Sequence, residues 1–391
     1  MTPPPRPARR PANPNFASGP CAKHPGWTAQ SIDGALLGRS HRSREGKARL
    51  KAVLERTKAI LELPPGFQAA IVPGSDTGAF EMALWSMLGA RGVDALAWES
   101  FGKGWIGDIA RELKLGDARI MEADFGRLPD LSAVDFSRDV VFTANGTTSG
   151  VRIPDYDWIS ADRAGLVFVD ATSAIFAQPV DWSKVDVLTY SWQKVLGGEA
   201  AHGVLILSPR AVERLESYRA PWPLPKLFRM TKGGKLDAAL FEGETINTPS
   251  MLCVEDYLDA LDWAESVGGL KGLMARADAN AKVLFDWIGD TAWVENLAAD
   301  RATWSNTSVC VRIVDHEVRA LAAEAQSAFA KKMAGLLDKE GVAKDIGSYR
   351  DAPPGLRIWT GATIEKSDLE ALLPWLDWAF AEAKFALRKA A

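Results

Sequence analysis

Two oppositely charged residues follow apolar segments of the kind that form buried strands. Asp170 ends the segment GLVFVD, and Lys194 follows VDVLTYSWQ, 24 residues further along the chain. In a parallel sheet, the carboxyl ends of the strands line the ligand crevice. There a lysine with a lowered pKa can form a Schiff base with pyridoxal phosphate, and an aspartate can keep the ring nitrogen protonated. The pair is therefore a candidate cofactor site, with a strand-end aspartate and a solvent-directed lysine as the alternative.

Two short segments could hold a phosphate group. The turn PGSDTG, between a predicted strand and a predicted helix, contains Ser75, Asp76 and Thr77. Backbone N–H groups at a helix N-terminus bind phosphate, so this turn is a candidate site. The segment NTPS, which begins with Asn247 and Thr248, places amide and hydroxyl donors before another predicted helix. An ordinary helix cap explains each segment equally well.

A glycine motif offers a competing site. Gly102, Gly104 and Gly107 in FGKGWIG satisfy the dinucleotide pattern Gly-x-Gly-x-x-Gly, and Glu122 and Asp124 follow about 20 residues later. The strand before the motif is weak, and no partner for hydride transfer is evident. We therefore expect a tight turn between a strand and a helix, with an NAD-dependent oxidoreductase as a distant alternative.

The composition of the 391-residue chain excludes several classes of partner. A net charge of −4 gives no electrostatic case for nucleic acid or an anionic membrane. The three widely spaced cysteines and the four histidines form no metal-binding pattern. The odd number and wide spacing of the cysteines indicate reduced thiols in a cytoplasmic protein. No apolar run is long enough to span a membrane, and the Pro-rich opening lacks the apolar region of a secretory signal.

Short apolar segments alternate with helical periodicity from about residue 40 to about residue 212. This pattern predicts an α/β fold in which a mostly parallel, mixed sheet is covered by helices on both faces. Towards the C-terminus helices dominate, and the strand-like segments SVCVRIV and GLRIWT indicate a smaller α+β domain. We expect a flexible or extended lead-in over residues 1–14, a large cofactor-binding domain over 15–268 and a small domain over 269–391.

Five segments in a fixed order carry a family resemblance. NFASGP, SHRS, YSWQKVLG, INTPSM and GLRIWTG, between residues 15 and 361, resemble the phosphoserine aminotransferases, which are class V, fold-type I pyridoxal-phosphate enzymes. The resemblance covers nearly the whole chain. It implies a cytoplasmic homodimer of serine biosynthesis that moves an amino group from L-glutamate to 3-phosphohydroxypyruvate. The products would be O-phospho-L-serine and 2-oxoglutarate, and a related activity in pyridoxine biosynthesis is expected.

The resemblance also assigns roles at the cofactor. Lys194 matches the Schiff-base lysine, and Asp170 matches the partner of the pyridine nitrogen. The further contacts that it implies are Gln193, Asp76 and Thr77 at the phosphate, Thr147 near the 3′ oxygen, and Asn247 and Thr248 at the phosphate of the neighbouring subunit.

Four residues match contacts to the substrate's phosphate and carboxylate groups, namely His41, Arg42, Arg350 and Arg357. Guanidinium groups suit both anions because they can bind them bidentately. The resemblance does not say which arginine meets which anion.

This chain departs from one branch of the family at three places. That branch has Gly-Arg where Asp76-Thr77 stands and His-Arg where Tyr349-Arg350 stands, so two potential cations for the substrate phosphate are missing here. Its ring-stacking tryptophan has two possible counterparts, Phe101 and Trp105. A class V aminotransferase that uses unphosphorylated serine or alanine with glyoxylate is therefore the alternative function.

Overall fold

The centre of the protein is a seven-stranded sheet with the strand order β1-β9-β8-β7-β4-β2-β3. The computed structural model describes residues 5–390. Strand β9 runs antiparallel to its neighbours β1 and β8, and the other neighbouring strands are parallel. The strands are β1 (Gln68–Pro73), β2 (Val93–Ala97), β3 (Ala118–Glu122), β4 (Asp139–Thr143), β7 (Val167–Asp170), β8 (Val187–Ser191) and β9 (His202–Leu207).

Helices cover both faces of this sheet, because its strands are apolar on both sides. In β9, Val204 and Ile206 join the core beneath α1 and α5, whereas Leu205 and Leu207 join the core beneath α2 and α4. These helices are α1 (Arg44–Ile60), α2 (Ser75–Met87), α3 (Ser100–Gly107), α4 (Pro209–Ser217) and α5 (Met251–Ser266). The predicted α/β architecture is confirmed.

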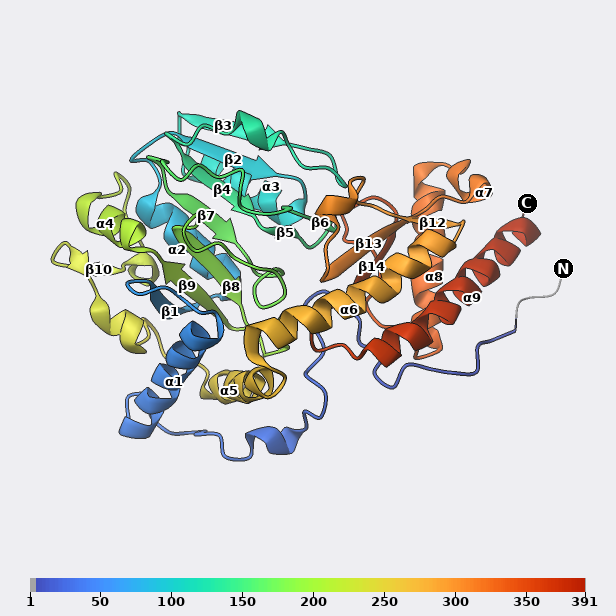
Figure 1. The fold of residues 1–391 in the computed structure, drawn as a ribbon, viewed down its shortest axis with the longest axis horizontal. Helices are drawn as coiled ribbons and strands as arrows, with labels where there is room; N and C mark the ends of the chain where they lie inside the picture. The colour runs from blue at the N-terminus through green and yellow to red at the C-terminus, as the bar shows by residue number, and fades with distance from the viewer. Residues whose placement is uncertain (1–4, 391) are drawn as a thin grey trace.

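A second sheet of three antiparallel strands, in the order β12-β13-β14, lies beside the first (Figure 1). Its strands and helices are β12 (Val294–Asn296), β13 (Ser308–Ile313), β14 (Gly355–Trp359), α6 (Gly269–Asp290), α7 (His316–Arg319), α8 (Ala323–Lys339) and α9 (Lys366–Ala390). The predicted domain boundary falls at the break between α5 and α6, where Gly268 has a φ of 101°. Buried residues of both sheets nevertheless belong to one continuous apolar core.

Short elements connect these units. They are β5 (Asn145–Gly146), β6 (Val151–Arg152), β10 (Thr231–Lys232), β11 (Lys235–Leu236), the 3-10 turns Ala29–Ile32, Leu131–Ala133, Lys226–Phe228, Ala238–Glu242 and Arg301–Thr303, and a π-turn at Asp108–Glu112. Among the described residues, no helix is long and apolar enough to cross a membrane.

The N-terminal segment runs in extended form along α9 and then enters the protein. The backbone N–H of Ala12 donates to Asp368 at 2.7 Å, and the indole N–H of Trp375 donates to the carbonyl of Arg9 at 2.8 Å. Further on, the N–H of Trp359 in β14 donates to the carbonyl of Phe16 at 3.0 Å. The segment therefore connects the helices of the small sheet to the interior.

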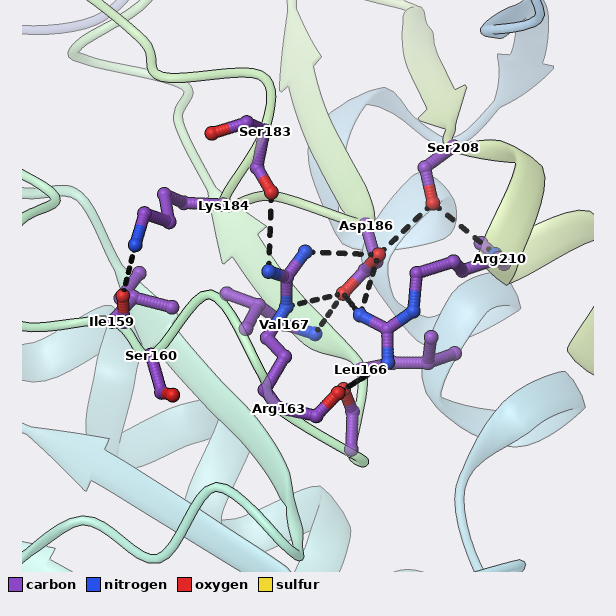
Figure 2. Close-up of polar contacts among 12 residues, drawn as sticks. Ile159, Ser160, Arg163, Leu166, Val167, Ser183, Lys184, Asp186, Ser208 and Arg210 are labelled. Carbon is purple, nitrogen blue, oxygen red and sulfur yellow. Dashed lines mark hydrogen bonds and ion pairs between the residues drawn. The ribbon is translucent and has the colours of Figure 1, made fainter.

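A buried carboxylate joins strands β7 and β8 at their amino ends. Asp186, which is 1% exposed, accepts hydrogen bonds from Arg163 at 3.1 Å and from Arg210, Ser208 and the backbone of Val167 at 3.0 Å. Figure 2 shows both guanidinium groups turned toward this carboxylate. The charge is tolerated there because cations and hydrogen-bond donors surround it.

The same arrangement recurs along this edge of the sheet. Asp139 at the start of β4 pairs with Arg214 at 2.8 Å, and Asp94 in β2 pairs with Arg138 at 2.8 Å. Both aspartates are fully buried. Arginine–aspartate pairs therefore neutralise the amino-terminal edge of the sheet, opposite the edge at which the predicted cofactor residues lie.

Replacing Asp186 with Asn should lower the free energy of unfolding by about 3–5 kcal/mol, because the buried guanidinium of Arg163 loses its counter-charge. Denaturant unfolding followed by circular dichroism measures this loss. The exposed Asp157→Asn variant is the control and should change stability by less than about 0.5 kcal/mol. Equal unfolding midpoints for Asp186→Asn and the wild type would contradict this assignment.

Candidate active site

A cavity with a volume of ≈ 270 Å³ lies at the carboxyl ends of β4, β7 and β8, beside the first residues of α2 and α3. The predicted site residues that line it are Asp76, Thr77, Phe101, Trp105, Thr147, Asp170, Gln193 and Lys194, and Ser75 of the candidate phosphate turn lies with them. Lining residues to which the sequence assigned no role are Gly19, Pro20, Thr143, Thr172, Ser191 and Ala200. Strand polarity therefore gathers residues that are far apart in the chain.

Lys194 follows β8 and reaches the N-terminal segment. Its side chain is 8% exposed, its Nζ donates to the carbonyl of Ser18, and Nζ lies 5.7 Å from the ring centroid of Trp359. Gly19 leaves the space for this contact, because a Cβ at this position would lie 2.5 Å from Nζ. Its φ of 139° also disfavours other residues.

Burial is the main cause that lowers the pKa of the Lys194 amine below its ordinary value. The positive charge of Arg357 lowers this pKa further, whereas the nearby acidic groups Cys21, Asp170 and Glu99 raise it. A lowered pKa increases the fraction of neutral amine at neutral pH, and the neutral amine is the nucleophile.

Asp170, at the end of β7, is held in one orientation. Its Oδ2 accepts the indole N–H of Trp105 at 3.0 Å, and its Oδ1 accepts the backbone N–H of Thr172 at 3.0 Å. Trp105 itself packs against Phe80, with their ring centroids 4.7 Å apart. The carboxylate is 4% exposed, so its position is fixed by two donors and by its surroundings.

The two aromatic candidates for ring stacking differ in their surroundings. Trp105 is buried, and its N–H is engaged by Asp170. Phe101 is 40% exposed, and its ring packs against Tyr349 with centroids 5.6 Å apart. The Arg357 guanidinium lies 5.6 Å from the ring centroid of the same Tyr349. Phe101 and Tyr349 thus form one wall near the cavity.

Glu99 is a buried residue that the sequence reasoning missed. Its Oε1 accepts the N–H of Gly102 at 2.7 Å and caps α3, and its Oε2 accepts the hydroxyl of Thr148 at 2.9 Å. It therefore joins the helix that carries Phe101 and Trp105 to the segment next to Thr147. Glu is not among the residues preferred at a helix N-cap, so no local signal in the sequence pointed to this role.

Buried polar atoms without partners indicate that the cavity suits a polar ligand. Such an atom costs about 1–3 kcal/mol when it stays unpaired. Five of the lining residues carry one within the described part of the chain, namely Asp76 Oδ1, Thr143 Oγ1, Thr172 Oγ1, Ser191 Oγ and Gln193 Oε1. With the Lys194 amine, the Asp170 carboxylate and the N-terminus of α2, they fit the aldehyde, the ring nitrogen and the phosphate of pyridoxal phosphate.

The glycine motif does not form the predicted turn. Gly102, Gly104 and Gly107 all lie within α3, and Glu99 caps the helix before them. A Cβ on Gly102 would lie 3.2 Å from the Cβ of Ala97, so this glycine permits close packing of α3 on β2. The predicted turn is wrong, and no dinucleotide cradle exists at these residues.

The predicted substrate residues do not line the cofactor cavity. His41 and Arg42 line a separate hollow of ≈ 100 Å³, together with Lys47 and nearby residues. Arg350 is exposed, and half-buried Arg357 has an Nε without a hydrogen-bond partner in the described chain.

Asn247 and Thr248, predicted to bind a phosphate, are also outside this cavity. Both are exposed and precede α5. A single chain therefore brings together eight of the ten predicted cofactor residues in this cavity and none of the four predicted substrate residues.

Replacing Glu99 with Gln should reduce the pH dependence of stability. Burial raises the pKa of Glu99 from 4.5 to about 7, so the folded protein holds this proton more tightly than the unfolded chain. Stability is then lost as pH rises from about 4.5 to about 7, by about 3 kcal/mol. Glu99→Gln cannot ionise and should lack this loss, which denaturant unfolding at a series of pH values measures.

The exposed Glu55→Gln variant is the control and should unfold with the wild-type pH profile. If Glu99→Gln shows that same profile, the carboxyl group is ionised throughout and the prediction fails.

No protein-family model matches the chain. It is 56% identical over 375 residues to a phosphoserine aminotransferase of Methanosarcina mazei, and this match covers 96% of the chain and 99% of the relative. A crystal structure of a phosphoserine aminotransferase from Cytophaga hutchinsonii has a TM-score of 0.77 at 21% identity, over 93% of this chain and 99% of that one.

An alanine–glyoxylate aminotransferase from Nostoc sp. has a similar fold, with a TM-score of 0.75 at 18% identity over 97% of each chain. These two structures show the fold, and the relative from Methanosarcina shows the family. The distant NAD alternative is wrong, and the expected pyridoxal-phosphate-dependent transaminase is confirmed. The chain belongs to the phosphoserine aminotransferase family.

Proposed function

We propose that this enzyme transfers the amino group between L-glutamate and 3-phosphohydroxypyruvate, giving O-phospho-L-serine and 2-oxoglutarate. The observation that carries the proposal is the buried Lys194 amine, which shares one cavity with the fixed carboxylate of Asp170. The relationship to the Methanosarcina enzyme supports these substrates.

Pyridoxal phosphate supplies the electron sink for amino transfer. Lys194 Nζ would bind the cofactor and then accept the proton from the substrate's Cα, a role that its lowered pKa suits. The Ser18 carbonyl, which accepts from Nζ, orients the amine.

The other cavity residues would hold the cofactor in place. Asp170 would accept a hydrogen bond from the protonated ring nitrogen, and Thr147 would lie near the 3′ oxygen. Thr77, Gln193 and the N–H groups that begin α2 would bind the phosphate. Between the two aromatic candidates we favour Phe101 for stacking, because the N–H of Trp105 is already engaged by Asp170 and Phe101 keeps an exposed surface.

A homodimer would complete the site. Asn247 and Thr248 are exposed and apart from the cavity of their own chain, which supports a contact with the cofactor phosphate of a neighbouring subunit. His41, Arg42, Arg350 and Arg357 would then bind the substrate's phosphate and carboxylate groups.

Two further expectations accompany this function. Action on a phosphorylated precursor of pyridoxine would use the same anion-binding residues. The three cysteines are unpaired, which supports a reducing, cytoplasmic location. The alternative donors, unphosphorylated serine or alanine with glyoxylate, have support from the fold of the Nostoc enzyme alone.

Replacing Lys194 with Ala should abolish covalent attachment of the cofactor. When the protein is mixed with pyridoxal phosphate and treated with borohydride, the wild-type chain should gain the mass of one reduced cofactor. Mass spectrometry should detect no such gain for Lys194→Ala. Lys103 is an exposed residue of α3, so Lys103→Ala is the control and should be labelled like the wild type. Equal labelling of Lys194→Ala would refute the assignment.

Replacing Arg42 with Ala should reduce kcat/KM for O-phospho-L-serine by about tenfold to a hundredfold, because a charge-assisted contact to the phosphate is lost. The rate with unphosphorylated serine should change little. Steady-state assays with both donors measure this difference, and Arg39→Ala, an exposed neighbour, serves as the control. An equal loss for both donors would argue that Arg42 does not read the phosphate.

A further inference from the structure

Two carboxyl groups lie in the cofactor cavity and form no ion pair within the described part of the chain. Asp76 and Asp170 both line this cavity, and they are 7% and 4% exposed. Neither forms an ion pair with a basic side chain in the described part of the chain, in contrast to Asp186, whose carboxylate meets two arginines. Two neighbouring buried carboxylates that lack ion-pair partners are unfavourable, so one carboxyl group should keep a proton.

Hydrogen bonds distinguish the two groups. Asp170 accepts one N–H from Trp105 and one from Thr172, both at 3.0 Å. The buried Oδ1 of Asp76 has no partner among the described residues. Donated hydrogen bonds stabilise the ionised form of a carboxyl group, and the Oδ1 of Asp76 lacks one, so we expect a proton shared by the two groups to reside on Asp76.

The surroundings of Asp76 favour its neutral form. Burial, and after it the negative charge of Asp170, raise the pKa of Asp76 well above its ordinary value. The other titratable groups that influence Asp170 and its surroundings are Glu99, whose own pKa is raised by burial, and Lys194, whose pKa burial lowers. Burial makes the Lys194 amine easier to deprotonate, so it is a weak counter-charge for the pair.

We propose that Asp76 and Asp170 share one proton, and that the neutral Asp76 donates its O–H to the carboxylate of Asp170. The pair then holds one proton and one negative charge, and no covalent bond other than the O–H is involved. Asp76 acts as a positioning residue that gives Asp170 a third donor.

This role rests on the proposed function, because it concerns how the cavity receives pyridoxal phosphate. Asp76 stands in the first turn of α2, where the phosphate would bind. An ionised carboxylate there would repel the phosphate, whereas a neutral acid would not. Sharing the proton therefore leaves a single negative charge, on Asp170, to face the ring nitrogen.

The test is infrared spectroscopy of the full-length, cofactor-free protein. It is done in the Glu99→Gln background, because Glu99 is a second buried acid with a pKa of about 7. At about pH 7 ordinary Asp and Glu side chains are ionised, since their pKa values are about 3.9 and about 4.3. We expect the absorption band of one protonated carboxyl group per chain, and its loss when Asp76→Asn is added.

Asp256→Asn is the matched control. Asp256 is 2% exposed but is paired with Lys23 at 2.8 Å, so this variant should leave the band unchanged. The proposal is overturned if the band is absent before Asp76 is replaced, or if it remains afterwards.

A second measurement applies if the Asp76→Asn variant does not fold. In Glu99→Gln alone, the band should persist at pH values above the ordinary aspartate pKa of about 3.9. Disappearance at that ordinary value would overturn the proposal. These measurements use protein without cofactor or substrate, so their failure would not contradict the proposed amino transfer. The labelling of Lys194 tests that function separately.

Discussion

Burial of the Lys194 amine is the constraint on which the site depends. An ammonium group in this position would lose its hydration, and the structure offers it a backbone carbonyl and an aromatic face without a carboxylate ion pair. The amine is therefore easily deprotonated. Three features shape the cavity around this amine. Gly19 leaves space for it, Trp105 orients Asp170, and Glu99 caps the helix that carries Trp105.

Buried carboxylates at the two ends of the strands of the large sheet have different partners. At the amino-terminal edge, Asp94, Asp139 and Asp186 each meet at least one arginine, and their charges are neutralised within the protein. At the carboxyl-terminal edge, Asp170 accepts from two N–H donors and forms no ion pair within the described residues, and several polar atoms nearby stay unpaired. The first edge is complete by itself, whereas the second is complete only with a ligand. Stability and function are thus separated across the width of one sheet.

The sequence was sufficient to predict the parts of the site that depend on local order. Asp170 and Lys194 follow apolar strands, and the parallel arrangement of such strands brings their ends together. Ser18 could not be found in this way, because its contact with Lys194 joins residues 176 positions apart. Glu99 escaped because its importance comes from burial, and the glycines of α3 were misread because a helix can begin before such a motif. The roles of Asn247 and Thr248 came from resemblance alone, since one chain leaves them exposed.

The extended N-terminal segment has a consequence for how the protein matures. Residues near position 14 to 21 pair with Lys344, Trp359 and Gln193, and so they depend on strands and loops that lie much later in the chain. During synthesis these residues leave the ribosome first, yet they can find their places only when β14 has followed. We therefore expect the Ser18 carbonyl to reach Lys194 only after β14 has been synthesised. A nascent chain can form its large sheet well before it can form a working active site.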